Sequence, residues 1–158
     1  MSGFLLDTNV ISELVRPKPE PLVLEWLEAA DESLLYLSVL TLGEIRKGLA
    51  LLPQSKRRTL LETWLEVELR ARFSGRILPI DVGVSDRWGL LAAEATRRGK
   101  TLATIDALLA ATAFHFNLTI VSRNANDFAP TSVPLLNPWE EEWPPSTNRK
   151  RVERGSVR

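Results

Sequence analysis

The chain has 158 residues, 44% of them hydrophobic and 25% charged, which predicts one globular domain and excludes collagen-like, low-complexity and wholly disordered proteins. Twenty Lys and Arg balance twenty Asp and Glu, so any attraction to nucleic acid must come from local patches. The absence of cysteine excludes a disulfide scaffold, a thiolate metal site and a cysteine nucleophile, and it is compatible with a reducing cytoplasm.

Predicted strands and helices alternate along the chain. The strands are short apolar runs, and the helices have apolar residues three and four positions apart with capping residues at their ends. In chain order we expect a strand at 4–7, helices at 9–15 and 21–27, a strand at 34–37, a helix from Ser38 or Thr41 to Leu49, and a long helix at 55–73. A strand at 76–81, a helix from Ser85 to Gly99 with Asp81 as a further cap, a helix at 104–116, a strand at 118–122 and an edge strand at 133–136 follow. This order predicts an α/β fold with a mostly parallel sheet between helices.

The composition changes after Trp139. Three glutamates, a tryptophan and two prolines come first, and residues 148–158 hold five basic residues and one acid. We interpret 140–158 as a flexible tail and 1–139 as the domain. No apolar run approaches the roughly 20 residues of a membrane span, and the N-terminus lacks the features of an export signal. We therefore expect no membrane association and a cytoplasmic location.

Three acidic residues have apolar sequence neighbours. Asp7 ends a hydrophobic strand, Glu44 lies in an apolar helix, and Asp106 opens a helix of Leu and Ala. Ligand sites of parallel α/β sheets form at the carboxyl ends of the strands, so Asp7 is the first candidate for chemistry. Structural explanations stay open. Asp7 could cap a helix, and Glu44 could pair with Arg46 or Lys47. The helix dipole would favour an acid at Asp106, in the first turn of its helix, whatever else that residue does.

The three acids become informative together if folding gathers them. At about 4 Å and an effective dielectric constant near 20, each pair of carboxylates would repel by about 4 kcal/mol, so an ionised cluster requires a cation. Oxygen ligands suit Mg²⁺ or Mn²⁺ rather than zinc, and a chain with no Cys and one His offers little to a softer metal.

Four segments carry recognisable motifs. They are residues 5–13 (LLDTNVISE), 38–48 (SVLTLGEIRKG), 106–113 (DALLAATA), and 119–124 (TIVSRN) with Asp127-Phe128, and Asn137-Pro138-Trp139 follows them. In this unbroken order over residues 3–139, they resemble PIN-domain ribonucleases, especially the VapC and FitB branch of bacterial toxin–antitoxin toxins.

The resemblance implies a three-layer α/β/α PIN-like nuclease domain over residues 1–139. Asp7, Glu44 and Asp106 would be catalytic residues that hold Mg²⁺ or Mn²⁺, and the metal would activate a water for attack on an RNA phosphodiester. No side-chain nucleophile would be needed. The resemblance also implies a homodimer that is silenced by a VapB-like antitoxin.

The fourth acidic position departs from the family pattern. Asn124 stands where many members have Asp. An amide can still orient a water, so we keep Asn124 as a catalytic candidate, but its missing charge leaves one or two metal ions open. Asp127 could compensate if its loop turns inward, or it could cap a turn before Phe128. Thr8 and Ser122 could support the carboxylates by hydrogen bonds or make local turn bonds.

Two other functions stay open. The missing acid is compatible with a catalytically weak PIN-like module that binds RNA or an antitoxin partner. A phosphatase with an aspartyl nucleophile would also place an acid after the first strand, but Asn9 stands where it needs a second acid. We expect His115 to be a satisfied or exposed helix residue rather than a catalytic base, and the tryptophans to pack in the core or a dimer rather than to stack on bases. The basic clusters at 56–58 and 97–100 could contact phosphates or be solvated.

Overall fold

The computed structural model describes residues 3–140. Its elements are β1 (Phe4–Leu6), α1 (Thr8–Glu13), α2 (Pro21–Ala29), the 3₁₀ helix η1 (Glu32–Leu34), β2 (Leu35–Ser38), α3 (Val39–Ala50), α4 (Lys56–Thr63), the π-helix η2 (Trp64–Leu69), α5 (Arg70–Arg72) and β3 (Ile77–Leu78). They continue with α6 (Val82–Arg97), α7 (Thr104–Phe116), β4 (Thr119–Val121), α8 (Ala125–Phe128), the 3₁₀ helix η3 (Ala129–Thr131) and β5 (Leu135–Leu136). The predicted tail, apart from Glu140, lies outside the described residues, so its boundary stays a prediction.

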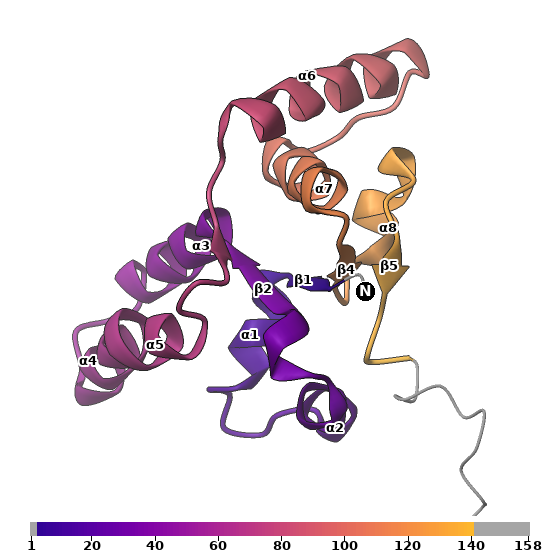
Figure 1. Ribbon diagram of the computed structural model, residues 1–158. Helices are drawn as coiled ribbons and strands as arrows, with labels where there is room; N and C mark the ends of the chain where they lie inside the picture. The colour runs from indigo at the N-terminus through magenta and orange to yellow at the C-terminus, as the bar shows by residue number, and fades with distance from the viewer. Residues whose placement is uncertain (1–2, 141–158) are drawn as a thin grey trace, which may run out of the picture.

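The five strands form one sheet in the order β3-β2-β1-β4-β5, and every neighbouring pair is parallel. The chain extends the sheet from β1 to one side through β2 and β3, and it then crosses to the other side of β1 to add β4 and β5 (Figure 1). The strand order therefore reverses between β1 and β4. In open α/β sheets, ligands bind at the carboxyl ends of the strands at such a switch point.

Helices cover both faces of the sheet, which confirms the predicted three-layer α/β/α fold (Figure 1). Successive strand side chains point to opposite faces, so Leu6 and Val121 pack with the helices of the first half, while Leu5 and Ile120 pack with α7 and α8. Trp26 from α2 is buried in the first of these cores. Burial on both faces explains why the strands read as continuous apolar runs.

Two predicted elements differ from the structure in form. The long helix expected at 55–73 is helical from Lys56 to Arg72 but consists of α4, η2 and α5, because the backbone widens into a π-helix at Trp64–Leu69. The strand expected at 76–81 shortens to Ile77–Leu78. Pro79 follows directly and has no N–H to donate to a neighbouring strand.

The predicted cap of α6 was wrong for Ser85 and right for Asp81. α6 already begins at Val82, and the Asp81 carboxylate accepts a 2.9 Å hydrogen bond from the Val84 N–H. At the other end, Gly99 adopts a positive φ of 66°, as expected of a residue that closes a helix. Of the two predicted caps of α3, Ser38 is the one that caps, accepting a hydrogen bond from the Leu40 N–H.

Among residues 3–140, no helix has both the length and the hydropathy that crossing a lipid bilayer requires.

Candidate active site

The site lies where β1 and β4 end, at the switch point of the sheet. Asp7 follows β1 and Ser122 follows β4. The pairing of the two strands continues into the site, because the Asp7 N–H donates to the Val121 carbonyl oxygen over 2.9 Å. Asp7 is 8% exposed, so its carboxylate lies in the floor of the site. Asp7 is also the N-cap of α1, which confirms the capping interpretation and is compatible with a place in the site.

Hydrogen bonds fix both oxygens of the Asp7 carboxylate. Oδ1 accepts from the Thr8 N–H over 2.8 Å, and Oδ2 accepts from the Ser122 hydroxyl over 2.7 Å. Burial raises the pKa of Asp7 above its usual value, the bonds from Ser122 and Thr8 oppose that rise, and the charge of Asp127 adds to it. The carboxylate is therefore rigidly oriented but electrostatically destabilised in its ionised form.

A network around Ser122 determines which way its hydroxyl points. Ser122 Oγ accepts from Asn9 Nδ2 over 3.3 Å and from the Asn124 N–H over 3.0 Å. With both lone pairs engaged, its proton is directed at Asp7. Asn9 is fixed in turn, because its Oδ1 accepts from the Arg123 N–H over 3.3 Å and its Nδ2 also reaches Asp7 Oδ2 at 3.5 Å.

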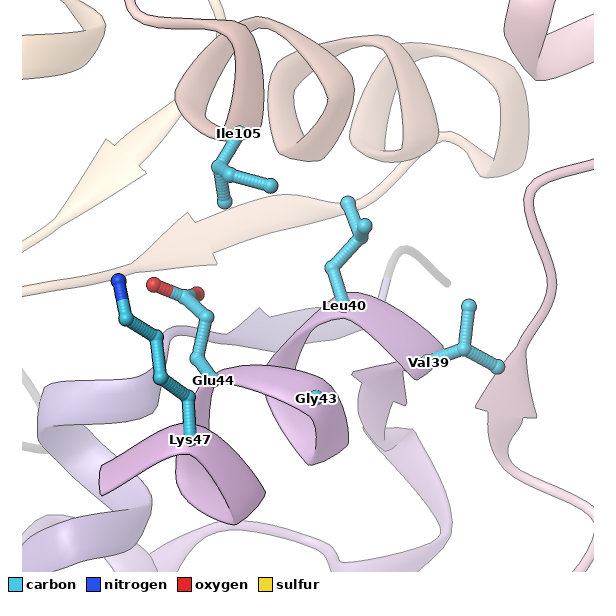
Figure 2. Close-up of a pocket in the computed structure, with 6 residues that line it drawn as sticks. All are labelled: Val39, Leu40, Gly43, Glu44, Lys47 and Ile105. Carbon is cyan, nitrogen blue, oxygen red and sulfur yellow. The ribbon is translucent and has the colours of Figure 1, made fainter. Parts of the chain in front are cut away.

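Thr8 connects Asp7 to the second acid of the site. The Thr8 hydroxyl donates to Glu44 Oε1 over 2.9 Å. Glu44 lies on α3 and lines a groove of about 430 Å³ together with Lys47 and Ile105. In Figure 2 the Glu44 and Lys47 side chains run beside each other from α3 towards the start of α7, where Ile105 lies. Arg46, one of the two predicted partners of Glu44, forms an ion pair with Glu66 instead.

Asp106 is coupled to the other acids through its charge. It lies in the first turn of α7, one residue after Ile105 of the groove. Burial raises the pKa of Asp106 to about 6, and the negative charges of Asp7, Asp127 and Glu44 contribute to the rise in that order. Carboxylates from three other segments therefore lie near enough to Asp106 for their charges to disfavour its ionised form.

Asn124 and Asp127 occupy the loop and short helix after β4. Both are exposed, and both line a polar cavity of about 260 Å³. The charge of Asp127 raises the pKa of Asp7 and of Asp106, which supports the expectation that Asp127 faces the acids. Among residues 3–140, no hydrogen bond reaches its carboxylate, so nothing there favours the alternative of a turn cap.

Comparison with known proteins identifies the family. The PIN domain family profile matches residues 4–132. The chain belongs to the PIN-domain family. It is 40% identical over 136 residues to the VapC ribonuclease Y4jK of Sinorhizobium fredii, covering 86% of this chain and 97% of that protein. It is 39% identical over 137 residues to Toxin FitB of Neisseria gonorrhoeae, covering 87% and 99%. The crystal structure of FitAcB from Neisseria gonorrhoeae superposes with a TM-score of 0.83 at 39% identity, covering 87% of this chain and 99% of that one.

The acids of this PIN domain suit a hard divalent cation in chemistry but not as a closed cage. Among residues 3–140, no three His, Asp or Glu side chains are arranged as a set that could itself hold a metal ion. Burial and the charges of the neighbouring acids nevertheless raise the pKa of Asp106, and a cation near these acids would offset the part that comes from repulsion. Mg²⁺ keeps several of its waters and is usually bound through one or two carboxylates, so an all-oxygen set that is not a closed cage still suits Mg²⁺ or Mn²⁺ in its chemistry.

Asn9 is the residue of this PIN-domain site that sequence reasoning missed as a contributor. It lies inside the first motif, two residues after Asp7, but its partners Ser122 and Arg123 lie more than a hundred residues away. The only available signal was the polar run Asp7-Thr8-Asn9 after a buried strand. Trp26 is fully buried, as expected of a core tryptophan. His115 lies in the last turn of α7, as expected of a helix residue, and contacts the Phe116 ring edge-on.

Proposed function

We propose that this PIN-domain protein is an endoribonuclease that hydrolyses RNA phosphodiester bonds with the help of Mg²⁺ or Mn²⁺, and that it acts as the toxin of a toxin–antitoxin pair in the cytoplasm. One observation carries the proposal: Thr8 donates hydrogen bonds to both Asp7 and Glu44, and the charges of these two acids raise the pKa of Asp106, so carboxylates from three remote segments lie near one another. Two relatives at 39–40% identity, a VapC ribonuclease and Toxin FitB, support the reaction and the toxin role.

Asp7, Glu44 and Asp106 would hold the cation, together with its waters. When bound, Mg²⁺ or Mn²⁺ supplies a more acidic water and neutralises charge that develops on the phosphate. The fit rests on the all-oxygen donor set and on the negative charges that, together with burial, raise the pKa of Asp106, because a cation beside these carboxylates would offset their repulsion.

The chain's own residues would orient and charge the site. Ser122 and Thr8 hold the Asp7 carboxylate in one rotamer, and Thr8 also fixes Glu44. Asp127 adds a negative charge on the side where Asn124 provides an amide in place of an acid. We propose that Asn124 orients a water by its amide and that Asp127 makes up part of the missing charge.

The decisive experiment compares the wild type with Asp7→Asn on a single-stranded RNA in the presence of Mg²⁺ or Mn²⁺. We expect the substitution to abolish cleavage and leave the circular dichroism spectrum unchanged, because the amide keeps the shape of the side chain and loses the charge. Asp86→Asn is the matched control, since Asp86 is an exposed acid on α6. Equal cleavage by wild type and Asp7→Asn, or cleavage in excess EDTA, contradicts the proposal.

The toxin role implies partners. We propose a homodimer that is inhibited by a VapB-like antitoxin, encoded next to this protein. Co-expression with the product of the adjacent gene tests this: we expect a stable complex with suppressed RNA cleavage. If no neighbouring gene product suppresses RNA cleavage, the toxin role is contradicted while the nuclease activity stands.

A catalytically weak PIN module is the second candidate, and a specific observation favours it. The described residues lack a ready three-ligand set, and Asn124 replaces an acid. Isothermal titration calorimetry with Mn²⁺ discriminates between the two functions. Measurable Mn²⁺ binding that Asp7→Asn removes favours the nuclease, whereas tight RNA binding without Mn²⁺ affinity favours the binding module.

A further inference from the structure

Two cavities flank the acidic site, and each combines a site carboxylate with one cation. The Lys47 groove contains Glu44 and Lys47 (Figure 2). The Arg123 cavity contains Asp127 and Arg123. The remaining polar side chains of the Arg123 cavity are Asn124, Asn126, Asn137 and Glu140.

A series of neighbouring residues connects the two cations through the acids. Lys47 lies three residues after Glu44, hence on the same side of α3, and the two side chains share the Lys47 groove. Glu44 accepts from Thr8, and the Thr8 N–H donates to Asp7. Asp7 accepts from Ser122, whose neighbour Arg123 lines the other cavity. The two cations are therefore the end members of a connected series of residues whose middle members include the acids Glu44 and Asp7.

Neither cation is neutralised by an acid of the described chain. Ion pairs among residues 3–140 engage Arg16, Arg46, Arg58, Arg72, Arg76, Arg97 and Arg98. Lys47 and Arg123 take part in none of them. Both side chains are exposed, so their charges face whatever approaches the site.

Arg123 is positioned by its surroundings while its donors stay available. Its guanidinium lies over the Trp139 ring, 5.6 Å from the centroid. Its N–H donates to Asn9, and its carbonyl oxygen accepts from Asn137 Nδ2 over 3.4 Å. No hydrogen bond within residues 3–140 uses the guanidinium. A planar guanidinium held on an aromatic ring keeps its edge for phosphate oxygens.

A polyanion that reaches this site must approach several carboxylates, and cations at the two ends of this series would offset that repulsion. We propose that Lys47 and Arg123 bind the RNA phosphates on the two sides of the scissile phosphate, so that the strand runs from the Lys47 groove across Asp7 to the Arg123 cavity. This inference rests on the proposed ribonuclease function. It adds the path of the substrate and two phosphate-binding residues outside the acidic set.

The test measures RNA binding without chemistry. Every variant is made in the Asp7→Asn background, and the affinity for a fluorescein-labelled single-stranded RNA of mixed sequence is followed as the salt concentration rises. Each phosphate contact to a single strand contributes about 0.7 to the slope of log affinity against log salt, which corresponds to about fivefold in affinity at about 0.1 M salt. We expect Lys47→Gln and Arg123→Gln each to lower the slope by about 0.7, and the double variant to lower it by about twice that amount.

Matched controls separate a defined path from general attraction. Lys56→Gln and Arg87→Gln remove exposed cations that form no ion pair within residues 3–140 and that line cavities without a site acid. They should leave the slope unchanged. Lys47→Arg and Arg123→Lys keep the charge and should retain most of the slope, with Arg123→Lys binding more weakly because it loses the planar fork.

Three outcomes overturn the inference. Unchanged slopes in Lys47→Gln and Arg123→Gln exclude phosphate contacts, and equal losses in the control variants indicate diffuse attraction. Intact RNA binding with loss of antitoxin binding would assign the two cations to a protein partner. Cleavage assays with Asp7 intact keep the two proposals apart: cleavage with unchanged slopes contradicts only the path, and altered slopes without any cleavage contradict only the nuclease.

Discussion

The Thr8 hydroxyl donates a 2.9 Å hydrogen bond to Oε1 of Glu44, across 36 residues of sequence. The Thr8 N–H meanwhile donates to Asp7, so one residue fixes a carboxylate with its side chain and another with its backbone. This arrangement links the end of β1 to α3. It holds the carboxylates of Asp7 and Glu44 in fixed positions near each other, although their like charges repel.

Replacing Thr8 by Val tests this link. Val keeps the shape of Thr and the backbone bond to Asp7, but it removes the donor to Glu44. We expect RNA cleavage to fall by 10- to 100-fold, on the order of the losses seen when a residue that supports a metal ligand is removed. The free energy of unfolding should fall by only about 1 kcal/mol, as measured by urea denaturation.

Two variants control that experiment. Thr8→Ser restores the hydroxyl and should recover most of the activity. Thr63→Val makes the same chemical change at an exposed position of α4 and should affect neither cleavage nor stability. A Thr8→Val protein with full activity would show that the orientation of Glu44 is not important for the reaction.

Ser122→Ala removes a donor that lowers the pKa of Asp7. With burial unopposed by this bond, the pKa of Asp7 rises further, so cleavage that needs the ionised carboxylate should lose activity first at the acidic end of its pH profile. The Asn124 N–H and Asn9 Nδ2 also lose their acceptor, and we expect a loss of about 1–3 kcal/mol in stability. The pH profile of kcat/KM checks the first effect and urea denaturation the second.

The exposed Ser74→Ala is the matched control for Ser122→Ala. It should leave both the pH profile and the stability unchanged. If Ser122→Ala lowers activity equally at every pH, its effect is a general loss of structure and the role in the titration of Asp7 is contradicted.

Sequence reasoning predicted the elements of this fold better than their arrangement. Apolar runs and helix periodicity located the strands and helices, because those signals are local. The position of β4 beside β1 was not predictable in the same way, since the 112 residues between Asn9 and Ser122 contain no local mark of which strands become neighbours. The π-helix at Trp64–Leu69 had no signal either, because its sequence has the same pattern as a regular helix.

The acids of the site were predictable as candidates, and their couplings were not. Asp7, Glu44 and Asp106 stood out because each interrupts apolar sequence. The role of Asn9 depends on Ser122 and Arg123, which only the folded sheet brings near. The metal-holding role assigned to the acids stays a prediction, which the cleavage and calorimetry experiments address.

Gly83 is needed where α6 approaches α7. A Cβ at position 83 would lie 2.4 Å from Cε1 of His115, so the imidazole would have to leave its place against Phe116 and Asp81. We expect Gly83→Ala to cost about 1–2 kcal/mol in stability, because overpacking against the imidazole outweighs the helix propensity that Ala adds. Gly89→Ala on the same helix meets no atom within 4 Å and should stabilise the protein by up to about 1 kcal/mol. Equal urea midpoints for the two variants would contradict this account of the α6–α7 contact.

The raised pKa of Asp106 predicts how stability depends on pH. An acid whose pKa rises from 3.8 in the unfolded chain to about 6 in the fold binds its proton more tightly when folded. Its favourable contribution is therefore complete below about pH 4 and is lost as the pH rises through about 6. Asp106→Asn removes this titration. We expect the free energy of unfolding of Asp106→Asn, relative to that of the wild type, to be about 1 kcal/mol higher at pH 7 than at pH 4. This figure allows for solvent screening at a partly exposed site.

Divalent metal gives the same prediction a second readout. At pH 7, Mg²⁺ or Mn²⁺ would bind the ionised site and offset the repulsion that destabilises it, so it should raise the unfolding midpoint of the wild type and much less that of Asp106→Asn. Asp86→Asn, which alters an exposed acid on α6, should respond to pH and to metal like the wild type. Two results together would contradict this prediction: the stability of the wild type changes with pH no more than that of Asp106→Asn, and metal shifts the unfolding midpoint of neither protein. They would show that the Asp106 carboxylate neither titrates near pH 6 nor contacts the cation.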